Sequence, residues 1–271
     1  MIWDADPIML DLGFVSIRWY GFLFSLGFLA GYAQMKRIYI REMKPLEDFD
    51  RLLLIMLVST IVGARLGHCL FYEPAYYLSH PHEILRIWRG GLASHGGAIG
   101  ILIGLYIFTR KRPSQPYPWL LDRIAIPTAL AGCFIRVGNF FNSEILGEPT
   151  EVPWAVTFAR IDLVPRHPAM LYEAAAYLMA FSVLATHYRR NRSRTPSGRL
   201  LGLFLLLVFL ARLLIEFVKV DQAAWAAELP MSAGQILSLP AIAGGAVLLW
   251  RSAKTRRTDA QSEASSSRLS A

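Results

Sequence analysis

GCFIRVGNFFNSEILG, residues 132–147, closes a long apolar run that begins near Ile124. Over a short distance it carries a guanidinium, two carboxamides and a carboxylate, with glycines between them. Such polar groups are costly inside a bilayer and mark functional positions there. On a helix Arg136 and Asn139 share a face, and Gly138 lets another backbone or a ligand come close. The stretch therefore predicts a site for an anionic group at a membrane helix.

The composition predicts an integral membrane protein. Of 271 residues, 54% are hydrophobic and 18% are charged. The apolar residues fall in blocks of about 20, the length that crosses roughly 30 Å of hydrocarbon. The formal charge of +8 lies in short basic clusters between these blocks, which is typical of cytoplasmic loops and argues against nucleic-acid binding. Cys69 and Cys133 lack any metal-ligand or CxxC spacing and are expected to be small buried hydrophobes.

The predicted fold class is an all-α membrane protein with seven transmembrane helices. Most Lys and Arg residues follow the first, third, fifth and seventh apolar blocks, so the N-terminus is expected outside and the C-terminus in the cytoplasm. Residues 1–14 contain aspartates and no basic residue, so no cleavable signal peptide is predicted. The seven blocks are residues 17–34, 52–72, 92–108, 120–139, 169–187, 200–218 and 234–250.

The expected organisation is one transmembrane catalytic domain, residues 1–251, followed by a tail. Residues 140–168 contain several prolines between apolar residues and are expected to form a small external arm or cap. Residues 252–271 are rich in Ser and basic residues and lack aromatics, so a disordered cytoplasmic tail near anionic lipid is predicted.

His95 begins a glycine-rich stretch, HGGAIG, at the external start of the third block. A helix start of this kind exposes backbone N–H groups at the positive end of the helix dipole, where anions bind readily. A histidine there can also take up or release a proton near neutral pH. The alternative is a capping or interfacial histidine. The flanking Gly96 and Gly97 favour the functional interpretation.

Two further arginines lie inside apolar blocks. Arg65 and His68 share a helical face, and a structural ion pair and a polar helix contact are the plain alternatives for them. Arg212 and Glu216 stand four residues apart. They either neutralise each other, or Arg212 divides its donors between Glu216 and a ligand phosphate.

The remaining polar positions suggest supporting roles. Tyr172 and Glu173 enter the membrane at the start of the fifth block, where they are expected to orient other polar groups. Tyr20 opens the first block and is either part of an aromatic belt or a donor to a lipid headgroup. The sequence contains no HExxH, GxSxG or P-loop motif. What remains is recognition of a phosphate on a lipid headgroup.

Four strings together resemble the bacterial prolipoprotein diacylglyceryl transferase family. The strings are HGGAIG at 95–100, RVGNFFNSE at 136–144 with Gly147, RHPAMLYE at 166–173, and Arg212 with Glu216 and Phe217. The family's GQILS string also occurs, at 234–238. Each string alone is weak, but their order and spacing are specific.

The resemblance implies a multi-pass enzyme of the bacterial inner membrane, with its N-terminus and active site towards the periplasm. It implies transfer of diacylglyceryl from phosphatidylglycerol to the lipobox cysteine of a preprolipoprotein, with formation of a thioether and release of glycerol phosphate. Membrane lipids would surround the protein, and neither a metal nor an organic cofactor is implied. The family's residues predict His95, Arg136 and Arg212 as catalytic. The predicted substrate-binding residues are Tyr20, Gly96, Gly97, Gly138, Asn139, Asn142, Glu144, Gly147 and Glu216.

The nucleophile in this reaction belongs to the substrate, so the chain needs no catalytic cysteine or serine. His95 is the candidate base, and the alternative is that nearby arginines lower the pKa of the thiol sufficiently. One position departs from the family, because Val208 stands where some members carry a functional tyrosine. The rival from another class is a lipid transporter or flippase that grips headgroups with the same arginines.

Overall fold

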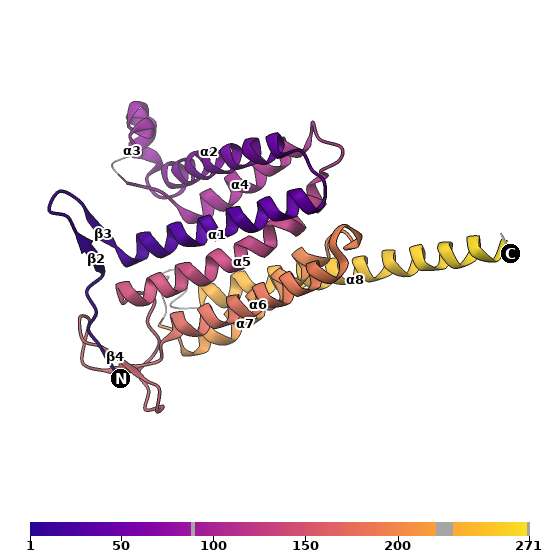
Figure 1. Cartoon of the computed structure of the whole chain (residues 1–271). Helices are drawn as coiled ribbons and strands as arrows, with labels where there is room; N and C mark the ends of the chain where they lie inside the picture. The colour runs from indigo at the N-terminus through magenta and orange to yellow at the C-terminus, as the bar shows by residue number, and fades with distance from the viewer. Residues whose placement is uncertain (88–89, 221–229, 270–271) are drawn as a thin grey trace. The chain divides into compact units, whose positions relative to one another are not determined.

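The computed structural model describes residues 1–87, 90–220 and 230–269, except for the side chains of residues 94 and 255–269 (Figure 1). The longer helices are α1 (Trp19–Arg41), α2 (Leu46–Phe71), α4 (Ser94–Thr109), α5 (Tyr117–Asn142), α6 (Ala169–Asn191), α7 (Arg199–Ile215) and α8 (Ala233–Leu269). The short helical turns are α3 (Pro74–Ser79), η1 (Pro81–Leu85), η3 (Arg192–Arg194) and η4 (Glu216–Val218). The strands are β1 (Ile2–Trp3), β2 (Ile8–Asp11), β3 (Ser16–Arg18), β4 (Val156–Phe158) and β5 (Pro165–Arg166).

Each predicted apolar block coincides with one of the longer helices. Within the described residues, the five segments 46–71, 117–142, 169–194, 199–218 and 233–254 are long and apolar enough to cross a membrane. The chain is therefore mostly helical, as expected of an α-helical membrane protein. Helix α4 is shorter than these five segments. Its 16 residues span only about 24 Å, less than the hydrocarbon thickness of a bilayer. Helix α1 is long enough, but Tyr and Trp residues and the cations Lys36 and Arg37 lower its apolar character.

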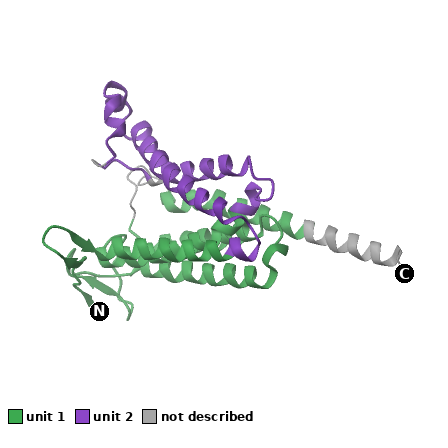
Figure 2. Cartoon of the chain, turned by 45° about the horizontal axis from the view of Figure 1, so that its top comes forward, with its two compact units in different colours: residues 1–37, 121–271 green, residues 38–120 purple. Residues whose placement is uncertain are grey.

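The chain divides into two compact units (Figure 2). The first unit contains Met1–Arg37 and Leu121–Ala271, and the second contains Ile38–Leu120. The boundaries fall within α1 and α5, so both helices contribute to both units. The expectation that residues 1–251 act as one catalytic domain stays a prediction.

In the second unit, glycines bring α2 and α4 together. A Cβ added to Gly63 would lie 2.7 Å from the Cα of Gly100, and one added to Gly67 would lie 2.7 Å from the Cα of Gly96. Small residues at such positions let two membrane helices pack backbone to backbone. At the other end of the unit, Tyr39 donates to Gln115 (2.7 Å), and Asp48 accepts from Arg112 (2.7 Å). These contacts make α2 and α4 a tightly packed pair.

In the first unit, close approaches fix α5 against its neighbours. A Cβ on Gly27 of α1 would meet the Cβ of Phe134 at 3.0 Å. At its other end α5 presents the buried Asp122, which accepts from the backbone N–H groups of Gly198 and Leu201, both at 2.8 Å. These groups start α7 and have no partner within their own helix. Asp122 thus anchors the beginning of α7, the helix that carries Arg212.

The predicted arm region contains two short strands. Strand β1 pairs in parallel with β4, and β4 pairs antiparallel with β5. Behind them, Phe140, Val156, Phe158 and Met170 form a buried apolar cluster, against which Trp3 packs. This cluster ties the end of α5 and the start of α6 to the strands.

At the C-terminus α8 continues as a helix to Leu269, and residues 270–271 lie outside the described part. Its composition is compatible with a helix, because no Gly or Pro follows Trp250, and Ala, Gln, Glu and Arg are good helix formers. The disorder expected for residues 252–271 stays a prediction.

Candidate functional site

Directly after α5 the backbone makes a strained turn. Ser143 and Ile145 both have positive φ, at 54° and 61°. This left-handed region is unfavourable for residues with a Cβ and especially for a β-branched one such as Ile145. The turn is held by the N–H of Glu144, which donates to the carbonyl of Asn139 (3.0 Å). It directs the polar residues 142–144 back towards the end of α5.

Gly147 follows this turn at a crowded crossing of three extended segments. Its N–H donates to the carbonyl of His167 (3.0 Å), and the N–H of Val220 donates to Leu146 (3.1 Å). A Cβ on Gly147 would lie 2.5 Å from both the Cβ and the carbonyl oxygen of His167, and 2.7 Å from the carbonyl oxygen of Val218. Only glycine fits there. Its role is close packing between the end of α7 and the start of α6.

The polar residues around this turn form a connected chain. Nη1 of Arg136 donates to Oδ1 of Asn139 (3.2 Å), whose Nδ2 donates to Oε2 of Glu144 (3.1 Å). Nδ2 of Asn142 donates to the other carboxylate oxygen of Glu144 (2.8 Å). Asn139 is buried and Glu144 is exposed, so the chain leads from inside the helices to the surface. Four residues predicted from the sequence thus come together.

Beneath Arg136 lies a second, fully buried ionic group. Nε of Arg136 is 2.6 Å from Oε2 of Glu173, whose side chain has no exposed surface. Nζ of Lys219 lies 3.4 Å from Oε1 of Glu173 and 3.4 Å from Oε2 of Glu216. These residues come from α5, α6 and the end of α7. Opposite charges alternate along the whole group, as buried ions require.

Glu216 pairs with Lys219 because the helix geometry changes at this point. Helix α7 ends at Ile215, and Glu216 begins a 3₁₀ turn. In such a turn residues three apart lie above one another, which brings Lys219 to Glu216. The carboxylate of Glu216 also lies against Gly234 in the first turn of α8, where a helix dipole favours negative charge.

Arg212 remains with an unused donor. Among the described residues, its buried Nε has no hydrogen-bond partner. The guanidinium of Arg136 lies 6.0 Å from the centre of the Tyr177 ring. Buried Oδ1 of Asn142 and Oγ of Ser143 likewise have no partner in the described part of the chain. Unpaired buried polar groups are costly, so their presence needs an explanation.

Tyr20 lies on α1 next to this group of residues. A Cβ on Gly138 would meet Cδ2 of Tyr20 at 3.0 Å and its Cα at 3.3 Å. Gly138 therefore admits Tyr20, and with it the start of α1, close to α5. Of the predicted residues, Tyr20, Arg136, Gly138, Asn139, Asn142, Glu144, Gly147, Arg212 and Glu216 all belong to the first unit.

His95, Gly96 and Gly97 belong to the second unit. His95 is exposed in the first turn of α4. Gly96 packs against the backbone of Gly63 and Gly67 on α2, so within this unit its small size serves helix packing. A Cβ on Gly97 would make ordinary contact with Ala64 at 3.5 Å. The predicted anion binding by these glycines stays a prediction.

Arg65 is used structurally in the second unit. Its guanidinium donates to the carbonyls of Glu83 (2.6 Å), Ile84 (2.8 Å), Gly90 (2.7 Å) and Gly91 (3.1 Å). The sequence suggested a structural ion pair for Arg65, but its guanidinium is instead satisfied by these backbone carbonyls. His68 stacks on Tyr72, with 5.5 Å between the ring centres. Arg65 thus holds residues 83–84 and 90–91 against α2 ahead of His95.

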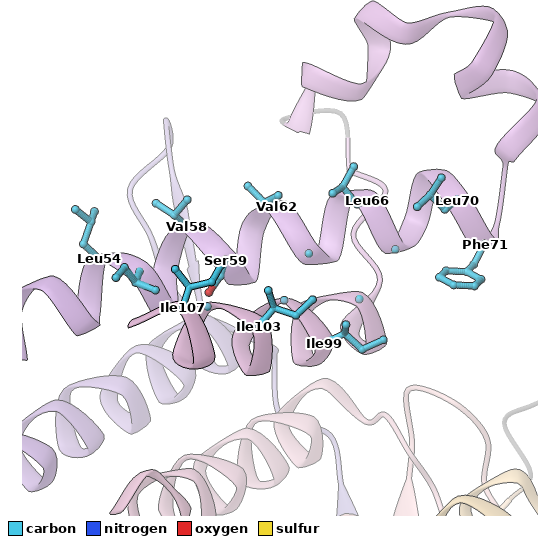
Figure 3. A pocket seen from close by; sticks show the side chains of 16 residues that line it. Leu54, Val58, Ser59, Val62, Leu66, Leu70, Phe71, Ile99, Ile103 and Ile107 are labelled. Atoms are coloured by element: carbon cyan, nitrogen blue, oxygen red, sulfur yellow. The ribbon is translucent and has the colours of Figure 1, made fainter. Parts of the chain in front are cut away.

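An apolar groove lies along α2 and α4 (Figure 3). Leu54, Val62 and Leu70 line it from α2, and Ile99 and Ile107 line it from α4. Apart from Ser59, the side chains that line it are aliphatic or aromatic, and no titratable group is among them. The groove is suited to hydrocarbon and offers no group for acid–base or ionic chemistry.

Sequence reasoning missed Lys219 and Tyr177 and assigned Glu173 only a general supporting role. A spacing signal existed for two of them, because Glu173 and Tyr177 stand four apart on α6 and share a face. Lys219 gave no such signal, since its position after α7 makes it look like an ordinary basic residue of an external loop.

In the described part of the chain, five helices are long and apolar enough to cross a membrane, and an ionic cluster is buried at the ends of α5, α6 and α7, which is typical of a polytopic membrane protein. The family model for prolipoprotein diacylglyceryl transferase matches residues 7–251. A phosphatidylglycerol--prolipoprotein diacylglyceryl transferase of Tolumonas auensis is 53% identical over 256 residues, covering 94% of this chain and 99% of the relative. Those of Chloroherpeton thalassium and Porphyromonas gingivalis are 49% and 41% identical, covering 94% and 93% of this chain and 95% and 94% of the relatives. The chain belongs to the prolipoprotein diacylglyceryl transferase family.

Proposed function

We propose that this chain transfers diacylglyceryl from phosphatidylglycerol to the lipobox cysteine thiol of a prolipoprotein, forming a thioether and releasing glycerol phosphate. The observation that carries the proposal is the unused donor of Arg212 in a unit that also holds Arg136. A guanidinium with free N–H groups suits two phosphate oxygens at once. The family membership and the names of the relatives support the same reaction.

The reaction breaks the bond between a glycerol carbon and a phosphate oxygen. Negative charge therefore develops on the departing phosphate ester, and in this proposal Arg136 and Arg212 stabilise it. In a poorly hydrated pocket such contacts are stronger than in water. Arg136 is oriented by the hydrogen-bonded chain of Asn139, Glu144 and Asn142. Glu216 joins the ionic cluster through its ion pair with Lys219. Tyr20, Gly138 and Gly147 shape the surroundings of the headgroup.

His95 is the proposed base, with Gly96 and Gly97 forming the start of its helix. A cysteine thiol has a pKa of about 8.5 and is mostly protonated at neutral pH. His95→Asn separates the two routes to a thiolate. If His95 removes the proton, the residual rate of the variant recovers as the pH rises through the thiol pKa. If the arginines activate the thiol, the variant has the pH profile of the original protein.

The proposed setting is the bacterial inner membrane, with seven spans, the N-terminus in the periplasm and the C-terminus in the cytoplasm. The distribution of Lys and Arg between the apolar blocks supports this orientation. The ionic cluster would then lie on the periplasmic side, where a secreted prolipoprotein presents its lipobox. Labelling of single cysteines placed at residues 13 and 112 from either side of the membrane tests it, in a background where Cys69 and Cys133 are replaced by Ala.

The direct test combines the purified protein with phosphatidylglycerol and a lipobox peptide. Mass spectrometry should show that the peptide gains one diacylglyceryl unit, and a peptide with Ser in place of the cysteine should gain none. Transport of labelled phosphatidylglycerol across vesicles without any change in the peptide mass would instead identify a flippase and refute the proposed transfer.

A further inference from the structure

Glu173 lies at the centre of the ionic cluster. Its side chain is fully buried, and its two carboxylate oxygens take different partners, Nε of Arg136 at 2.6 Å and Nζ of Lys219 at 3.4 Å. Lys219 is nearly as buried, with 3% of its side chain exposed. Removing three charged groups from water has a large free-energy cost, and apolar residues of similar size would often give an equally stable fold. Such a group is expected where a charge must be held in one place.

We propose that Glu173 and Lys219 are positioning residues of this site, which hold the guanidinium of Arg136 in the orientation needed for the substrate phosphate. The inference rests on the proposed function and extends it to two residues outside the predicted site. Glu173 forms an ion pair with Nε of Arg136, although its Oε2 has no hydrogen-bond partner among the described residues, and Nη1 of Arg136 donates to Asn139. Lys219 fixes Glu173 from the opposite side.

Lys219 is itself held by the backbone. It pairs with Gly147 in an isolated antiparallel bridge, and the N–H of Glu148 donates to the carbonyl of Val218 (2.9 Å). The strained turn at Ser143 and Ile145 precedes this bridge, so one short segment sets both Glu144 above Arg136 and Lys219 below it. The position of Arg136 is thus determined from two directions by residues 143–148.

Kinetics of the purified full-length variants test the inference. Glu173→Gln keeps the shape of the side chain and removes its charge, and kcat is expected to fall by about a hundredfold, the effect of a catalytic group displaced by about 1 Å. KM for phosphatidylglycerol should change less than kcat, since the orientation of the Arg136 guanidinium matters most for the charge that develops in the transition state. Lys219→Met should lower kcat in the same way, and Lys219→Arg should recover most of the loss.

A double variant separates a shared role from two independent ones. Glu173→Gln with Lys219→Met should lose no more activity than Glu173→Gln alone, because both residues act through Arg136. Additive losses would overturn the inference. Asp162→Asn is the matched control, since it removes a carboxylate that also lies 2.6 Å from an arginine, Arg166, but outside the cluster. Its kcat should equal that of the original protein.

The outcomes also distinguish this inference from the proposed function. If the unmodified protein forms no lipidated peptide, the proposed function fails. If it does, and the folded Glu173→Gln and Lys219→Met variants retain their kcat, only the positioning role is refuted. If Glu173→Gln does not fold, the two Lys219 variants provide the test. Equal activity of Lys219→Met and Lys219→Arg would then refute the positioning role.

Discussion

Arg65 and Arg212 are both arginines within apolar helices, yet their donors are used in different ways. Arg65 donates to four backbone carbonyls of residues 83–91. Arg212 has a buried Nε without a partner among the described residues. A satisfied arginine stabilises the fold, whereas one with an unused donor costs stability until a ligand arrives. The use of the donors, rather than the depth in the membrane, separates a structural arginine from a candidate ligand-binding one.

The largest expected effect is on catalysis by Arg212→Met. Loss of a donor to the developing charge should reduce the transfer rate by roughly a hundredfold to a thousandfold. The melting temperature should not fall, because the substitution removes a buried donor that has no partner in the described part of the chain. Single-turnover lipidation and thermal unfolding in the same detergent measure both quantities. A variant that melts earlier in proportion to its loss of activity would make Arg212 structural, like Arg65.

Arg65→Met should give the opposite result. Four carbonyls lose their donor, and the free energy of unfolding is expected to fall by on the order of 3 kcal/mol. Activity of the fraction that remains folded, measured at low temperature, should be close to that of the original protein. An unchanged melting temperature together with lost transfer would place Arg65 in the site and remove the contrast.

Gly147→Ala tests the crossing beside the cluster. The added methyl group would meet His167 at 2.5 Å, so overpacking should cost about 1–3 kcal/mol of stability. Gly21→Ala on α1 is the control, because a Cβ there meets nothing within 4 Å. That variant should be as stable as the original protein or slightly more stable, since Ala favours helix. Equal melting temperatures for both variants would contradict the packing described for Gly147.

The smallest effect is expected in the arm, at the partly buried ion pair of Asp162 and Arg166. The hydrogen bond from Arg166 holds the pKa of the Asp162 carboxyl below its usual value. A lowered pKa means that the stabilisation is present above the unfolded-state pKa of about 3.9 and is lost as the pH falls through the lower folded-state value. Asp162→Asn should therefore melt slightly earlier at pH 7, and the difference should disappear at the most acidic pH. A difference that grows towards acidic pH would contradict this.

The apolar blocks of the sequence predicted the approximate positions of the longer helices in the described residues, because a membrane-spanning segment must be both apolar and helical. That seven of them span the membrane stays a prediction. The sequence also indicated that Arg136, Asn139, Asn142 and Glu144 lie close together, since all four occur in the short segment 136–144 at the end of α5 and in the turn that follows it. The sequence did not predict Lys219 in the cluster. Lys219 contacts Glu173, which lies 46 positions earlier in the chain, and local sequence patterns do not show that two such distant residues are buried together.

The pairing of Glu216 shows another limit. A spacing of four predicts a contact between Glu216 and Arg212. In the described residues the ion pair of Glu216 is instead with Lys219, which the 3₁₀ turn at Glu216 and the backbone bridge to Gly147 bring there, a tertiary feature. For Arg65, the sequence identified the need for a partner but not that backbone carbonyls would meet it.

The central claim is that Arg212 keeps a donor for a phosphate group. Thermal unfolding with and without glycerol phosphate, the soluble leaving group, tests it directly, because a ligand that binds only the folded state raises the melting temperature. The original protein and Arg65→Lys should both be stabilised by glycerol phosphate, and Arg212→Met should not. An equal shift for Arg212→Met and the original protein would show that the phosphate is bound elsewhere.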